Sequence, residues 1–244
     1  MVYKITVKPN SSFIGDIKAN TLFGAFCYTY SNIVDDETFK EELDKVVFSD
    51  MFYENSLPEK IKNGEVKYKP LKNGVKVVKA EMHNIIDRGT GRTSNNGGLH
   101  NTQVTFSKSN MIFFMSTSLD KEELENIMKM MLLRGLGARK STGKGSFSLV
   151  SISKVDLDYT KDKKVVALSD FVPDDETSTN IEEVKIVCRE GITLNGEIQK
   201  PIYMLSVGSV FVKENNQRET CGKLLYDKET NTYINAKTIL YPVA

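Results

Sequence analysis

Apolar positions in the first 155 residues follow the two periods that distinguish strands from helices. Val2–Lys8 alternates between apolar and polar side chains, which predicts a strand. Apolar residues recur at intervals of three and four over Thr21–Ile33, which predicts an amphipathic helix with Asn20 as its cap. A second amphipathic helix is expected over Asp36–Phe48, followed by a short strand over Phe48–Tyr53.

A hairpin, a third helix and a last strand are expected further along the chain. Thr102–Phe106 and Met111–Thr117 are expected to pair as the hairpin, and Ser146–Ile152 is expected to be the last strand. Asp120 and Glu123 have the spacing of a capping box, so a helix should begin there. The methionines of this helix lie at core-facing positions. The order β–α–(insertion)–β–β–α–β is that of a ferredoxin-like split βαβ fold.

An insertion of about residues 56–101 interrupts this order. It is rich in Pro, Gly, Asn and Lys, with β-like runs at Glu65–Lys69 and Val75–Met82. Insertions of this length inside a compact domain are usually functional or disordered. Asp87–Gly98 is expected to form its tip.

The remaining sequence is rich in strand patterns and poor in helix patterns. A polar run at Asp174–Asn180 predicts a loop or boundary. We therefore predict an α+β protein with two ferredoxin-like (RRM-like) lobes. Residues 1–155 form the first lobe, which carries the insertion, and residues 156–244 form a degenerate, strand-rich second lobe. Strands of the second lobe are expected at Val184–Cys188, Pro201–Val212, Gly222–Tyr226 and Tyr233–Leu240.

Charge is balanced overall but is unevenly distributed. The formal net charge is +1, yet Arg88–Leu119 and Asn126–Val155 contain cations and no Asp or Glu. If the fold brings these segments together, they form a basic face for a polyanion; chance clustering is the alternative. The chain has three cysteines without metal spacing and no apolar run near the ~20 residues of a membrane helix. A cytoplasmic protein without membrane contact, metal or cofactor is expected.

Leu133–Phe147 is the clearest candidate for binding chemistry. It contains four glycines and four cations and no acid: Gly135, Gly137, Gly143, Gly145, Arg134, Arg139, Lys140 and Lys144. The glycine spacing excludes a P-loop and a dinucleotide fingerprint, and the helix precedes the loop instead of following it. At a helix C-terminus the macrodipole does not attract anions, so side-chain cations must bind any phosphate. A glycine cap at Gly135 followed by a plain turn is the alternative.

Three further segments resemble a known family. Phe13–Phe26 contains Asn-Thr-Leu-Phe-Gly, Met82–Arg92 is similar to an inserted thumb, and Tyr203–Phe211 resembles a glycine-containing strand of a second lobe. With the glycine-rich loop, they resemble the RAMP superfamily of CRISPR proteins, and within it the fourth subunit of the type III-A, or Csm, effector complex. Asn20 stands where that family usually has Asp, so a helix cap is kept and a charge is lost.

The resemblance implies an RNA-binding scaffold instead of a catalyst. Such a subunit holds the 5′ tag of the CRISPR RNA and bridges the large polymerase-type subunit to a RAMP backbone subunit. Its β-hairpin thumb, here the Asn84–Gly98 tip, inserts at the start of the guide. No catalytic residue is expected. The RNA-binding candidates are Asn20, His83, Asn84, Arg88, Arg92, Gly135, Gly137, Arg139, Lys140, Ser141, Thr142, Gly143, Lys144 and Gly145.

Two other functions remain possible on the sequence. Some RAMP relatives cut CRISPR RNA without metal through His, Tyr or Lys side chains. This chain has two histidines, His83 and His100, both in the insertion. Flexible insertion residues are poorly placed for the convergent acid and base that cleavage needs. A protein-interaction module without RNA affinity is the third hypothesis.

Overall fold

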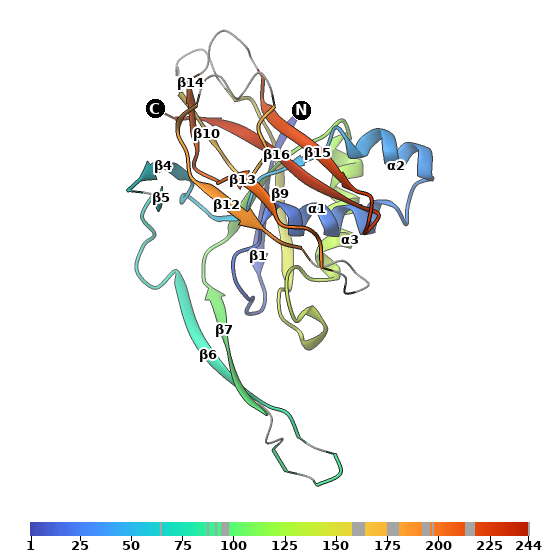
Figure 1. The fold of residues 1–244 in the computed structure, drawn as a ribbon, viewed down its shortest axis with the longest axis vertical. Helices are drawn as coiled ribbons and strands as arrows, with labels where there is room; N and C mark the ends of the chain where they lie inside the picture. Colours follow the sequence, from blue (N-terminus) through green and yellow to red (C-terminus); the bar gives the residue numbers. More distant parts are fainter. Residues whose placement is uncertain are drawn as a thin grey trace.

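In its described residues, the computed structural model of the chain has two five-stranded antiparallel sheets, three α-helices, an extended hairpin and two further short strand pairs (Figure 1). The structure describes residues 1–63, 65–86, 88–90, 92–93, 98–157, 164–174, 181–191, 196, 198–212 and 218–243. Parts of the expected insertion tip and of the expected boundary near 175–180 lie outside these residues. None of the described helices has the length and apolarity needed to cross a bilayer.

The first sheet has the strand order β2-β8-β1-β9, and β3 also pairs with β8. Its strands are β1 (Val2–Pro9), β2 (Val47–Phe48), β3 (Phe52–Tyr53), β8 (Met111–Ser116) and β9 (Phe147–Val155). The helices are α1 (Ala19–Tyr30), α2 (Asp36–Leu43) and α3 (Lys121–Leu133). The helices and the strands β1, β8 and β9 follow the predicted ferredoxin-like order, with β1 and β8 in the centre and β9 at the edge beside β1. The place beside β8 is taken by β2 and β3, which precede the insertion.

The second sheet has the strand order β11-β14-β10-β16-β15. The described residues of this half of the chain form no helix. Its strands are β10 (Lys164–Ala167), β11 (Ile181–Glu183), β14 (Val210–Val212), β15 (Thr220–Asp227) and β16 (Thr232–Pro242). Two short ladders flank it, formed by β4 (Pro58–Lys62) with β5 (Glu65–Tyr68) and by β12 (Ile186–Arg189) with β13 (Ile202–Leu205). The low helix signal of this half therefore reflects its structure.

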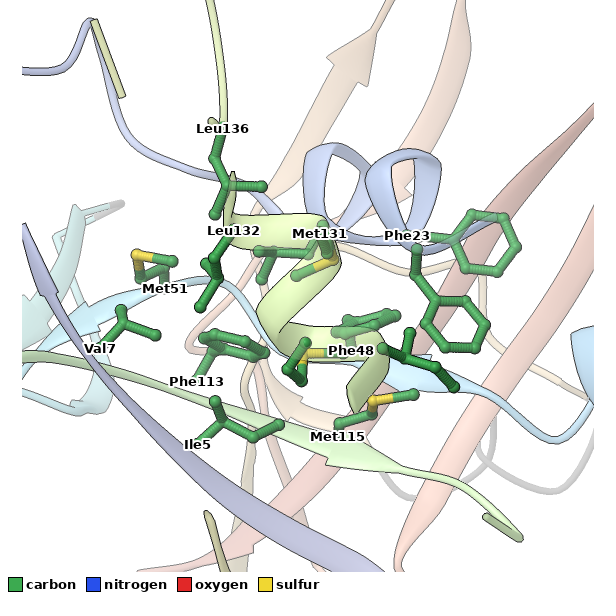
Figure 2. Close-up of a cluster of buried hydrophobic side chains, with 14 of the residues drawn as sticks. Ile5, Val7, Phe23, Phe48, Met51, Phe113, Met115, Met131, Leu132 and Leu136 are labelled. Carbon is green, nitrogen blue, oxygen red and sulfur yellow. The ribbon is translucent and has the colours of Figure 1, made fainter. Parts of the chain in front are cut away.

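β8 is apolar on both faces because both faces of the first sheet are covered. Phe113 and Met115 belong to the core under α1 and α3, whereas Ile112 and Phe114 belong to a second core that includes Ile239 of β16. Figure 2 shows Phe113 and Met115 beside side chains from the helices. Met128 and Met131 of α3 lie in the first of these cores, as predicted, whereas Met130 is exposed.

The start of α1 corrects one sequence prediction. The N-cap position is Lys18, and Asn20 lies inside the helix, exposed to solvent. The Ala19 N–H donates instead to Asp50 Oδ1 (2.8 Å), and Asp50 also pairs with Lys18 Nζ at 2.8 Å. A carboxylate from the β2–β3 connection thus supplies the cap that Asn20 was expected to supply.

Asp50 gives the fold a specific pH dependence. Its burial, only partly offset by Lys18 and reinforced by the nearby Asp170, raises the pKa of Asp50 from 3.8 to about 6. Between about pH 4 and about pH 6, the folded chain therefore keeps a proton that the unfolded chain has lost. The contribution of Asp50 to stability should fall as pH rises through this window.

An Asp50→Asn variant, which keeps a hydrogen-bond acceptor, should lack this fall. The measurement is the difference in unfolding free energy between the two proteins by urea titration at several pH values. The wild type should lose stability relative to the variant from about pH 4 to about pH 6. A difference that does not change with pH would contradict the assignment.

The pairing of the insertion corrects a second prediction. Thr102–Phe106 was expected to pair with Met111–Thr117, but β7 (Leu99–Ser107) pairs with β6 (Lys76–Asn84) over nine residues on each strand. β8 already has neighbours along both edges, because β1 pairs on one side and β2 and β3 on the other. β7 is therefore left to close a separate hairpin, which extends away from the two sheets (Figure 1).

Candidate nucleic-acid interface

The segment between α3 and β9 closes on itself, and we call residues 134–146 the glycine loop. The Leu136 N–H donates to the Gly145 carbonyl (2.8 Å), and the Gly145 N–H donates to the Ser12 carbonyl (2.8 Å). Gly135 (φ +75°) follows the C-cap of α3, so the glycine-cap interpretation is correct for that residue. The remainder is a hydrogen-bonded loop anchored to the chain after β1.

Glycine is required at position 145 by the loop itself. All four glycines of the loop have positive φ. At Gly145 an added Cβ would also lie 1.9 Å from the Leu136 carbonyl oxygen. At Gly143 it would meet nothing within 4 Å. Gly145 therefore allows the loop to close, whereas Gly143 leaves exposed backbone that a ligand can approach.

Two cations of the loop contact the base of the β6–β7 hairpin. We call Glu81, His83 and His100 the hairpin root. Lys144 Nζ lies 2.6 Å from Glu81 Oε1, and Arg139 Nη2 lies 3.0 Å from His100 Nε2. The two acid-free segments of the sequence do meet here, because Arg139 belongs to one and His100 to the other.

The two histidines lie side by side on paired strands. His83 and His100 are register partners, with ring centroids 5.3 Å apart. His83 Nε2 is shielded from solvent and has no hydrogen-bond partner within the described part of the chain. Partial burial, and then the nearby charge of Arg139, lower the pKa of His83 from its ordinary 6.5. His83 is therefore neutral at neutral pH.

Lys140 is an exposed cation of the loop. It begins a short 3-10 turn, Lys140–Thr142, in which Lys140, Ser141 and Thr142 are exposed. In the described structure its ammonium group has no ion-pair partner. Arg134 lies elsewhere, with its guanidinium carbon 4.0 Å from the Tyr28 ring centroid and a hydrogen bond to the Tyr28 hydroxyl (3.1 Å).

Four of the predicted site residues lie apart from the loop. Asn84 follows His83 on β6, so its side chain projects from the opposite face of the hairpin. Arg88 and Arg92 are exposed and lie beyond the last β6–β7 pair, toward the far end of the hairpin (Figure 1). Asn20 has no hydrogen bond to the glycine loop among the described residues.

Sequence reasoning did not select Ser12, Glu81 or Tyr28 as site residues, nor His100. Ser12 Oγ lies 3.1 Å from Lys144 Nζ. Glu81 contacts Lys144, Tyr28 contacts Arg134, and His100 contacts Arg139. One signal for Glu81 was present, because residues two apart in a strand share a face and His83 was already a candidate. Across the described residues, no three His, Cys, Asp or Glu side chains gather closely enough to hold a metal ion.

Chains with a similar fold occur in solved structures of CRISPR complexes. A chain of the Csm3–Csm4 subcomplex of the type III-A interference complex superposes with a TM-score of 0.67 at 16% identity, covering 100% of both chains. A chain of a Csm1–Csm4 cassette with pppApA gives 0.59 at 14% identity, over 100% of this chain and 98% of that chain. A chain of type III-B Cmr-beta, bound to cognate target RNA and AMPPnP, gives 0.58 at 12% identity over 86% of each chain.

A family model settles the relationship that these low identities leave open. No curated protein matches the sequence. The model of the RAMP superfamily matches residues 12–148, which is more than half of the chain and includes the hairpin and the glycine loop. The chain therefore belongs to the RAMP superfamily.

Proposed function

We propose that the chain is a non-catalytic, CRISPR RNA-binding subunit of a cytoplasmic type III-A effector complex. It holds the 5′ tag of the CRISPR RNA and bridges the large polymerase-type subunit to a RAMP backbone subunit. The observation that carries this proposal is the meeting of the glycine loop with the hairpin root. There Arg139, Lys140 and Lys144 lie close to one another beside a hairpin that extends away from the body of the molecule.

The chemistry of the surface suits a single-stranded RNA. Phosphate contacts supply affinity, and single-stranded RNA is recognised through bases that are splayed from the strand. The loop cations and the exposed backbone at Gly143 can contact phosphates. On the outward face of the hairpin, Asn84 lies beside Met82 (68% exposed) and Leu99 (59% exposed), so polar and apolar groups are available to bases.

The structural neighbours support the assignment to a complex. They include chains of the Csm3–Csm4 subcomplex and of the Csm1–Csm4 cassette, which this chain matches along its whole length. A subunit with two neighbours would need a separate surface for each. Partner contact in type III-A complexes is thus the role that we assign to the rest of the molecule.

Filter binding tests the proposal. The purified chain should bind a CRISPR RNA with its 5′ tag more tightly than a length-matched RNA with a scrambled tag. The affinity should fall with salt, with a log–log slope near about 2 for three phosphate contacts on a single strand. Binding that is absent at low salt, or equal for the two RNAs, would contradict tag recognition by this chain.

A metal-independent ribonuclease is the second candidate, because the structure places two histidines beside two cations. Two features oppose this function. Arg139 can only donate, so Nε2 of His100 accepts its hydrogen bond, and that nitrogen is not available as a base. Nε2 of His83 is shielded from solvent. Repeat RNA incubated with the chain in EDTA should therefore stay intact. Products that disappear with His83→Ala/His100→Ala would establish cleavage instead.

A further inference from the structure

The ammonium group of Lys144 already has an anionic partner within the chain. Lys144 is 16% exposed and contacts both Ser12 Oγ (3.1 Å) and Glu81 Oε1 (2.6 Å). Glu81 is 31% exposed. For an ion pair that is largely removed from water, the cost of desolvating the two charges offsets much of their mutual attraction. A stronger anion could therefore replace the carboxylate at small cost.

The surroundings of Glu81 contain more hydrogen-bond donors than one carboxylate uses. Its second oxygen lies 4.0 Å from His83 Nε2, which is beyond hydrogen-bond reach. His83 Nε2 has no partner in the described residues, and Arg139 contacts His100, whose ring stacks on the ring of His83. A phosphate carries more acceptor oxygens than a carboxylate and forms strong charge-assisted hydrogen bonds with such donors.

We propose that the Glu81 carboxylate occupies a phosphate subsite between the glycine loop and the hairpin root, and that an RNA phosphate displaces it from Lys144. This inference rests on the proposed function, because it assumes that RNA lies along the loop. It adds an internal competitor to that function. Lys144, Ser12 and Arg139 form the subsite, and Glu81 fills it when RNA is absent.

Displacement of Glu81 also has a consequence for the hairpin. Glu81 belongs to β6, so its contact with Lys144 ties the hairpin root to the loop. A phosphate in the subsite removes this tie and leaves the hairpin attached through the Arg139–His100 contact and the backbone hydrogen bonds between Phe13 and Thr105 of β7. RNA binding at the loop is thereby coupled to the attachment of the hairpin.

The first test compares two substitutions that each remove one negative charge from a Lys–Glu pair. Glu81→Gln should increase the affinity for tag-bearing CRISPR RNA about fivefold, because the competitor is lost. Glu229→Gln breaks the pair with Lys200 (2.5 Å) in the β15–β16 turn and should change the affinity little. Melting temperatures measured in parallel should show that both variants remain folded.

A double-mutant cycle then ties the effect to Lys144. In a Lys144→Ala background, Glu81→Gln should no longer increase the affinity, because the competition is for that ammonium group. A gain of the same size in both backgrounds would overturn the subsite and indicate a general charge effect.

Failure of the inference and failure of the proposed function give different results. If the wild type binds RNA and Glu81→Gln binds equally or more weakly, Glu81 positions Lys144 instead of competing for it, and only the inference falls. If neither protein binds RNA at low salt, the proposed function of the loop falls together with the inference.

Discussion

Replacement of Arg139, Lys140 and Lys144 by alanine should weaken binding of tag-bearing CRISPR RNA about 50-fold at about 0.15 M salt. Each phosphate contact of a single strand adds about 0.7 to the log–log salt slope, so the loss of three contacts should lower that slope by about 2. Salt-dependent filter binding measures both quantities. The effect should be large because Arg139 and Lys144 both contact the hairpin root, and Lys140 follows Arg139 directly in the exposed turn of the loop.

The matched control removes three exposed lysines from other parts of the first and second lobes. Lys62→Ala/Lys154→Ala/Lys228→Ala causes the same change in net charge, and these lysines lie on β4, on β9 and in the β15–β16 turn. This variant should retain most of the affinity and the slope. Equal losses in the two triple variants would show that net charge, and not the glycine loop, attracts the RNA.

A Gly145→Ala substitution should destabilise the chain by about 3 kcal/mol or more and abolish RNA binding at the loop. Two costs combine at this position. The backbone has a φ of +68°, and the new Cβ would lie 1.9 Å from the Leu136 carbonyl oxygen. Relief of that clash requires opening the hydrogen bonds that join Gly145 to Leu136 and Ser12. Urea unfolding and filter binding measure the two effects.

Gly143→Ala provides the control within the same loop. Gly143 also has a positive φ (+83°), but its added Cβ would meet no atom within 4 Å. Only the backbone cost of about 1 kcal/mol should appear. Equal stabilities of the Gly145→Ala and Gly143→Ala variants would contradict the conclusion that the loop can close only with glycine at position 145.

Elements fixed by neighbouring residues could be predicted from the sequence. The capping box of Asp120 and Glu123 is present at the start of α3 as expected. The ferredoxin-like order of strands and helices followed from hydrophobic periods, and the glycine loop lies between α3 and β9 as expected. Each of these signals is local, because it depends on spacing within one element or at its end.

Features that depend on distant partners could not be predicted in this way. Asp50 caps α1 from 31 residues away, so Asn20 seemed to be the natural cap. Glu81 reaches Lys144 across 63 residues, and it does so only because β7 pairs with β6 and not with β8. Sequence periods place side chains on faces of a strand, but they do not say which strand will be its neighbour.

Photochemical cross-linking tests the location of the RNA most directly. A CRISPR RNA with thiouridine in its 5′ tag would be bound to the chain, irradiated, and the attached peptides identified by mass spectrometry. Attachment is expected within the glycine loop and the β6–β7 hairpin. Attachment confined to the strands β10–β16 would contradict RNA binding at the loop and would place the RNA on the second lobe.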